Sequence, residues 1–449
     1  MSREVINRLK TGELPMDFDW NTQPHPLSRV PKLLPADPKP QQILHTKLVA
    51  EDLRDGLHGV PNYPEVPKML EYVGVLSQLG IDTMTVGIYT GDGKINNSIK
   101  KLLGSMRDQY PQVSPIVLSL AREDSINWAA DCKQINQNLQ AIVFMGSAPS
   151  RMIAQEWTQD YVLRQLALST KQAVKHDIDV IGATEHTTQT PPDFLKKIIK
   201  TQVDNGAKSF CAADTIGIAR PIGAYRQVRF IKKTLKEMGR EDVLVEWHGH
   251  RDTGNETANA MWAISAGADR IHIVSWGYGE RAGNTKLETV MINMTNILEE
   301  NGIKSPWERK MLSKVLNLYS DLVNIPSPTH GTMGANSQET SLGIHTDAKL
   351  KAERLADEAR EDGETELAAK LEQMGRRIYT AVDPESVGKE ETISVGPWSG
   401  KSTVILAARH LGIKNIPSEK TIANILKTTR SFGRVLTPQE LRNLLANNH

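Results

Sequence analysis

The sequence has few cysteines, few aromatic side chains and almost no net charge. Of its 449 residues, two are cysteines and 5% are aromatic, and 54 basic against 53 acidic side chains give a net charge of +1. Two cysteines cannot form a disulfide scaffold, so a reducing, cytoplasmic compartment is predicted. A nucleic-acid coat or a polybasic membrane binder needs a basic excess. We therefore predict no nucleic-acid partner.

Long apolar runs and a secretory signal are also missing. No stretch approaches the roughly 20 apolar residues that span a bilayer, and the start of the chain lacks the apolar region of a signal peptide. We therefore predict no membrane association. A chain of 449 residues is long enough for a large core with one or two appended domains, a size typical of an enzyme.

The sequence does contain short apolar runs that alternate with longer segments of helical spacing. Alternation of eight such runs at roughly 30-residue spacing predicts an α/β fold, specifically a (β/α)8 TIM barrel. A doubly wound open sheet is the alternative, and it is disfavoured because no glycine-rich dinucleotide fingerprint follows the first run. The runs are 43–50, 83–89, 114–121, 140–146, 179–185, 209–215, 243–250 and 270–276.

The rest of the chain has a different character. Residues 1–42 are rich in proline, which disfavours helix and sheet, and we predict an N-terminal arm. The barrel is expected over residues 43–300. A linker with a first small subdomain follows over 301–378, and a second small subdomain over 379–449, both mainly helical.

Polar residues at the predicted strand ends form a candidate metal site. His248 and His250 lie two residues apart at the end of one strand, so both imidazoles point to the same side. Asp55 follows the first strand, which barrel closure brings near the histidines, and Asn284 follows the eighth. Two imidazoles, a carboxylate and an amide oxygen suit a divalent cation such as Zn, Mn or Mg. The alternative is that the two histidines bond only to backbone.

Three other polar residues near strand ends have two interpretations each. Arg54 can stabilise a developing alkoxide or enolate, or hold the neighbouring carboxylate in place. Glu185 can position a water or transfer a proton, or accept a hydrogen bond from a histidine ligand. Thr215 can bind a substrate carboxylate or cap a turn. Cys211 lies inside an apolar run, so we predict that it belongs to the core.

Several motifs together resemble the DRE-TIM metallolyases, and in particular the branch of 2-isopropylmalate, homocitrate and citramalate synthases. The resemblance covers about residues 43–449. Two of the motifs lie in small subdomains after the barrel that the related lyases lack, which favours condensation over cleavage. The motifs are LRDG at 53–56, HGHRD at 248–252, GYGERAGNTKLE at 277–288, SLGIHTD at 341–347 and YTAVDPESVGKE at 379–390.

The resemblance implies a divalent-metal-dependent Claisen condensation of acetyl-CoA with a 2-oxo acid, giving a 2-alkylmalate-type product and CoA. The metal would chelate the keto and carboxylate oxygens of the acid. Arg54 would polarise the keto group, Thr215 would hold the carboxylate, His58 would contact substrate, and Glu185 would be catalytic. The metal-binding positions are matched by Asp55, His248, His250 and Asn284.

The resemblance also implies a homodimer. His345 matches a histidine that a neighbouring subunit inserts into the active site, with Tyr379 close to it, and His345 would remove a proton from acetyl-CoA. The sequence alone treats both as ordinary loop residues. The resemblance suggests a role in leucine biosynthesis, but without the further C-terminal domain that leucine regulates.

Some residues depart from the family pattern, and they leave the choice of 2-oxo acid open. The choice of metal is also open, because the ligand set suits several cations. A metal-dependent lyase or aldolase, or a non-catalytic paralogue that binds a metabolite, are the alternative functions. Related lyases use a cysteine in a loop after the barrel, and no cysteine follows Cys211. The departures are Thr85 for a glutamate, His58 for a glutamine, Gln189 for an arginine and Trp398 for a histidine.

Overall fold

The computed structural model describes residues 38–91, 93–413 and 415–446. The described residues divide into two compact units, 38–327 and 328–446. The predicted proline-rich arm, residues 1–42, lies outside the described residues except for 38–42. Within that stretch, helix α2 (Pro40–His45) begins, so the end of the predicted arm is helical.

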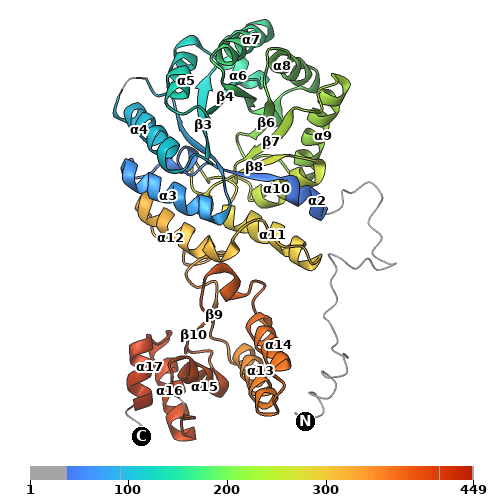
Figure 1. Ribbon diagram of the computed structural model, residues 1–449. Helices are drawn as coiled ribbons and strands as arrows, with labels where there is room; N and C mark the ends of the chain where they lie inside the picture. The colour runs from blue at the N-terminus through green and yellow to red at the C-terminus, as the bar shows by residue number, and fades with distance from the viewer. Residues whose placement is uncertain (1–37, 92, 414, 447–449) are drawn as a thin grey trace, which may run out of the picture. The chain divides into compact units, whose positions relative to one another are not determined.

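Eight parallel strands close into a barrel, which confirms the predicted (β/α)8 fold (Figure 1). β1 pairs with both β2 and β8, and Ala50 of β1 is in register with Ile273 of β8. The strands are β1 (Lys47–Ala50), β2 (Thr83–Ile88), β3 (Ser114–Leu120), β4 (Gln140–Gly146), β5 (Asp179–Glu185), β6 (Ser209–Asp214), β7 (Leu244–Gly249) and β8 (Arg270–Ile273).

The first apolar run is shorter as a strand than its residues suggest. Its first part belongs to α2, because Pro40 occupies the start of the helix, where its fixed φ favours helical backbone, and Ile43 is buried. The strand begins only at Lys47. Apolar residues at helical and at strand spacing are indistinguishable in so short a run.

Helices between the strands cover the outside of the barrel (Figure 1). The strands are apolar on both faces because one face meets these helices and the other meets the barrel interior. The helices are α3 (Val66–Leu79), α4 (Lys94–Gln109), α5 (Glu123–Ile135), α6 (Pro149–Ala154), α7 (Gln159–Lys175), α8 (Pro192–Asp204), α9 (Pro221–Glu237), α10 (Glu256–Ala266) and α11 (Leu287–Glu300).

A further helix of this unit, α12 (Leu312–Val323), fixes two loops at the C-terminal ends of the strands. Tyr319 donates a hydrogen bond to the Gly56 carbonyl at 2.8 Å, and Trp276 donates through Nε1 to the Leu316 carbonyl at 2.9 Å. A Cβ at position 56 would lie 2.2 Å from the Tyr319 hydroxyl, so only glycine fits there. The loops after β1 and β8 are thereby held in place.

The C-terminal unit is mainly helical, as predicted. Two short strands pair in parallel, β9 (Glu339–Thr340) and β10 (Thr392–Ile393). Helices α13 (Gly343–Glu361) and α14 (Thr365–Arg377) pack on each other, and α15 (Lys401–His410), α16 (Glu419–Phe432) and α17 (Pro438–Ala446) share a second apolar core. Within the described ranges, none of the helices has the length and hydropathy that a bilayer crossing requires.

Candidate active site

The loop after β1 places a paired arginine and aspartate at the C-terminal end of the barrel. Arg54 contacts Glu51 with Nη2 to Oε2 at 2.7 Å and Asp55 with Nη1 to Oδ2 at 2.9 Å. Burial raises the pKa of Asp55, but the Arg54 guanidinium and the nearby histidines lower it by more than burial raises it. The pKa therefore lies well below its usual range. Asp55 is therefore ionised at neutral pH. Both interpretations of Arg54 remain compatible with this geometry, because it holds Asp55 and also lines the cavity described below.

The two histidines of β7 converge on Asp55, as their spacing predicts. The Nε2 atoms of His248 and His250 are 3.3 Å apart, and they lie 3.5 and 3.9 Å from Oδ2 of Asp55. Donor atoms that share one cation at bond lengths near 2.1 Å are about 3.0–3.5 Å apart in tetrahedral or octahedral sites. The three atoms have this separation to within a few tenths of an ångström.

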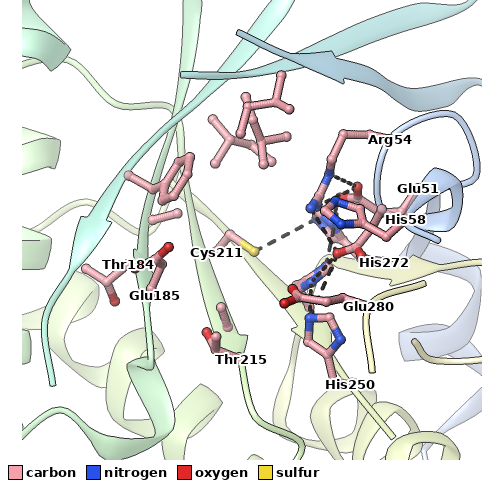
Figure 2. Close-up of a pocket in the computed structure, with 18 residues that line it drawn as sticks. Glu51, Arg54, His58, Thr184, Glu185, Cys211, Thr215, His250, His272 and Glu280 are labelled. Atoms are coloured by element: carbon pink, nitrogen blue, oxygen red, sulfur yellow. Dashed lines mark hydrogen bonds and ion pairs between the residues drawn. The ribbon is translucent and has the colours of Figure 1, made fainter. Parts of the chain in front are cut away.

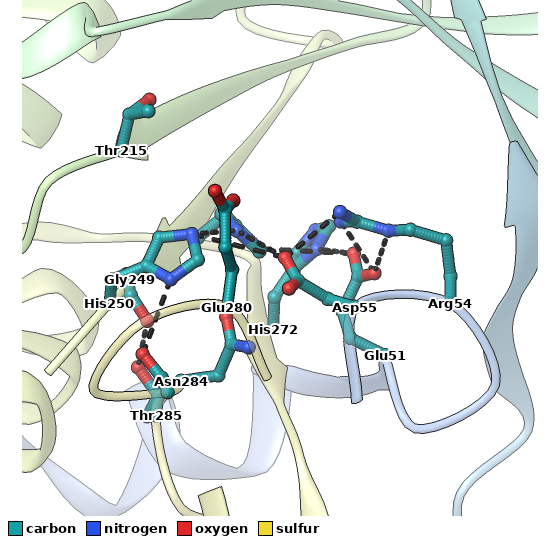
Figure 3. Close-up of polar contacts among 12 residues, drawn as sticks. Glu51, Arg54, Asp55, Thr215, Gly249, His250, His272, Glu280, Asn284 and Thr285 are labelled. Atoms are coloured by element: carbon teal, nitrogen blue, oxygen red, sulfur yellow. Dashed lines mark hydrogen bonds and ion pairs between the residues drawn. The ribbon is translucent and has the colours of Figure 1, made fainter. Parts of the chain in front are cut away.

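Asn284 completes the group from the loop after β8 (Figure 3). It forms a β-bridge with His250 and donates through Nδ2 to the Tyr278 carbonyl at 3.1 Å. Oδ1 of Asn284 and Oδ1 of Asp55 are both buried and have no hydrogen-bond partner among the described residues. A buried oxygen without a partner is costly, and a bound cation would satisfy both.

The protonation state of His250 also suits a metal. Burial, together with the neighbouring His248, lowers the pKa of His250 to about 4, so the ring is neutral at pH 7. Its Nδ1 lies 3.2 Å from the Gly283 carbonyl. With the proton on Nδ1 donated to that carbonyl, Nε2 keeps its lone pair for a ligand. The residues present therefore fit a divalent cation.

Next to this group lies a buried cluster of charges that sequence reasoning missed. His272 in β8 bonds Oε1 of Glu51 through Nδ1 at 2.6 Å and Oε2 of Glu246 through Nε2 at 2.9 Å. Burial lowers the pKa of His272, but its contacts with Cys211 and the two carboxylates raise it well above its usual range. Both ring nitrogens therefore donate, and His272 is an imidazolium.

Arginines complete the charge balance of this cluster. Arg270 contacts Glu246 at 3.0 Å, and Arg54 contacts Glu51. Burial raises the pKa of Glu51, but Arg54 and His272 lower it to about 2. A signal for the cluster exists in the sequence, since Glu246 precedes His248 by two residues and so points to the same side of β7.

A cavity of about 220 Å³ opens beside both groups (Figure 2). Arg54, Asp55, His248, His250 and His272 line one part of it. Apolar side chains of the neighbouring strands line the opposite part, and Cys211 lies between the two, buried as predicted (Figure 2). The cavity also contains the predicted substrate residues His58 and Thr215, the predicted catalytic Glu185, and Glu280.

Thr215 and Glu185, two further residues at strand ends, each have a hydrogen-bond or ion-pair partner in the structure. Thr215 accepts a hydrogen bond from the His186 amide at 2.7 Å, so it fixes a turn, and its own hydroxyl proton remains free to donate. Glu185 is half-buried, with its Oε2 3.3 Å from Nε of Arg151, a partner that sequence reasoning did not name.

His345 and Tyr379 lie in the C-terminal unit. Their rings stack with centroids 3.9 Å apart and planes at 20°. Of the residues that depart from the family pattern, only His58 lines the cavity. Thr85 is fully buried in β2, and Trp398 is 83% exposed.

The fold and the site together define a class: a (β/α)8-barrel protein with a candidate divalent-cation site at the C-terminal ends of its strands. The HMGL-like family matches residues 45–318, more than half of the chain. The chain belongs to the HMGL-like family.

Curated relatives of this chain are named as synthases. It is 26% identical to a 2-isopropylmalate synthase from Pyrococcus abyssi over 365 residues, which cover 80% of this chain and 69% of the relative. It is 26% identical to a putative 2-isopropylmalate synthase from Buchnera aphidicola over 88% of this chain and 95% of the relative. A homocitrate synthase from Methanopyrus kandleri is 25% identical over 85% and 86% of the two chains.

Solved structures of two lyases share the fold. The hydroxymethylglutaryl-CoA lyase of Pseudomonas aeruginosa superposes with a TM-score of 0.52 at 18% identity, covering 63% of this chain and 94% of that one. The HMG-CoA lyase of Brucella melitensis gives 0.51 at 15% identity, with 62% and 99% covered. At these identities the likeness extends to the barrel fold alone.

Proposed function

We propose that the chain is an enzyme that condenses acetyl-CoA with a 2-oxo acid in a divalent-metal-dependent Claisen reaction. Acetyl-CoA, the 2-oxo acid and one water give a 2-alkylmalate-type diacid and free CoA. The observation that carries the proposal is the convergence of Asp55, His248 and His250 beside Arg54 at one cavity, with Asn284 bridged to His250. The names of the curated relatives support the same reaction class.

A divalent cation held by these four residues would supply Lewis acidity toward the keto group of the acid. Arg54 is fixed by Glu51 and Asp55 and faces the cavity, where its permanent charge stabilises the negative oxygen that develops on that keto group. The free hydroxyl proton of Thr215 can donate to the substrate carboxylate. Glu185, positioned by Arg151, takes part in proton transfer.

Proton removal from the acetyl group is assigned in this proposal to His345. Its ring stacks on Tyr379, which restricts its orientation. By the resemblance, this histidine acts in the active site of a partner subunit, so we expect a homodimer. The stacked pair is the observation that supports a shared role for the two residues.

The test is release of free CoA thiol. Metal-loaded protein is incubated with acetyl-CoA and each of a panel of 2-oxo acids, and free thiol is measured over time. Release that requires one of the acids supports the synthase. Release from acetyl-CoA alone indicates a thioesterase, and no release with any acid would overturn the proposal. His248→Ala should abolish the release of thiol. The matched control is His176→Ala, on an exposed histidine after α7, which should leave the release unchanged.

A further inference from the structure

The interior of the barrel has an apolar side, formed by β3 to β6 up to Glu185 at the end of β5, and a charged side. Side chains alternate along each strand, so Leu118 of β3, Ile142 and Phe144 of β4, Ala183 of β5 and Cys211 of β6 all point inward. The register places Leu118 beside Ile142, and Phe144 beside Ala183, which neighbours Cys211. All of them line the cavity.

The charged side of the cavity offers no unpaired lysine or arginine to a second carboxylate on the substrate. Arg54 is the sole arginine or lysine among the cavity-lining residues, and it already contacts Glu51 and Asp55. His272 contacts two carboxylates. Glu185 and Glu280 also line the cavity, and each contacts an arginine outside the lining, Arg151 at 3.3 Å and Arg281 at 3.5 Å. A second carboxylate on the substrate would therefore meet either apolar side chains or cations that already contact a carboxylate of the protein.

We infer that the 2-oxo acid is a monocarboxylic acid whose side chain is aliphatic and larger than methyl. The inference rests on the proposed function and names the substrate class of the same site. The keto and carboxylate groups lie toward Arg54 and the metal ligands, and the aliphatic side chain lies against Leu118, Ile142 and Phe144. A carboxylate in that position would lose its hydration without gaining a partner.

Direct binding is the first arm of the test. The metal-loaded protein is titrated calorimetrically, without acetyl-CoA, with pyruvate, 2-oxobutyrate, 2-oxoisovalerate and 2-oxoglutarate. Each buried methylene strengthens binding about fourfold, so 2-oxobutyrate should bind about fourfold, and 2-oxoisovalerate about 15-fold, more tightly than pyruvate. 2-Oxoglutarate should bind about 100-fold more weakly than the best aliphatic acid. Binding of pyruvate or 2-oxoglutarate that equals the aliphatic acids would overturn the inference.

The thiol assay is the second arm, and it separates the inference from the proposed function. If kcat/KM is highest with 2-oxoglutarate among the acids tested, the inferred substrate class is wrong, while the proposed condensation is supported. Thiol release with none of the acids would overturn the function, while the titration would still decide the substrate class.

Two variants on β4 locate the side-chain site. Ile142→Ala enlarges the apolar side, so it should raise the preference for 2-oxoisocaproate over 2-oxoisovalerate by about tenfold. Val143→Ala is the matched control, because Val143 is equally part of the core but alternates to the outer face of the strand. It should leave the ratio within about twofold. An equal shift in both variants would contradict the assignment of Ile142.

Discussion

The buried imidazolium of His272 gives the sharpest prediction for stability. The substitution His272→Leu removes two hydrogen bonds, of 2.6 and 2.9 Å, to ionised carboxylates inside the barrel. A hydrogen bond to a charged group contributes about 1.5–3 kcal/mol, and loss of one partner from a buried ion pair costs about 3–5 kcal/mol. Arg54 and Arg270 remain on Glu51 and Glu246. We therefore expect the free energy of unfolding to fall by about 3–5 kcal/mol rather than by the sum of both bonds.

Urea unfolding of the metal-free protein, followed by near-UV circular dichroism, measures this loss. His176→Leu is the matched control, since it removes an exposed histidine and should change stability by less than about 0.5 kcal/mol. A double-mutant cycle of His272→Leu with Glu246→Gln should give a coupling of at least about 1.5 kcal/mol. A loss below about 1 kcal/mol with no coupling would refute the charged cluster as described.

Three further outcomes are expected. Glu288 is buried, and burial raises its pKa from 4.5 to about 7. The folded protein therefore loses stability as the pH rises from about 4.5 to about 7, because the unfolded chain ionises this group first. Glu288→Gln should stabilise the protein by up to about 3 kcal/mol at pH 8 and leave it unchanged at pH 4. Equal effects at both pH values in denaturant titrations would contradict this. His248→Ala should abolish Mn or Zn binding in calorimetry, and retained affinity would contradict the donor set, while His176→Ala should bind normally. His248→Ala and His345→Ala subunits, each inactive alone, should regain about a quarter of wild-type activity after mixing; no recovery despite exchange would argue against action across subunits.

The barrel was predictable because its strands are apolar on both faces and alternate with helices, and Asp55, His248, His250 and Asn284 were predictable as a group because barrel closure brings strand ends together. The donor atoms do converge, although their function as metal ligands stays a prediction. The charged cluster around His272 was missed because its partners come from the loop after β1 and from β7, far apart in the chain. No local pattern indicates a histidine bonded on both nitrogens.

Other features depend on packing that the sequence does not show. Three such features are the helix α2 inside the first apolar run, the pairing of Glu185 with Arg151, and the burial of Thr85 away from the cavity lining. The family motifs, rather than periodicity, singled out His345 and Tyr379. Their stacking is a tertiary contact within the C-terminal unit that the spacing of 341–347 and 379–390 does not reveal.

Formation of the new carbon–carbon bond is the most direct test of the account. The metal-loaded protein is incubated with acetyl-CoA labelled with ¹³C at both acetyl carbons and with 2-oxoisovalerate, and the products are examined by ¹³C NMR. We predict that the two labels appear as the CH₂–COO⁻ group of a diacid, attached to a carbon that carries a hydroxyl, with one free CoA per product. Labelled acetate alone, or unchanged acetyl-CoA, would contradict the proposed condensation.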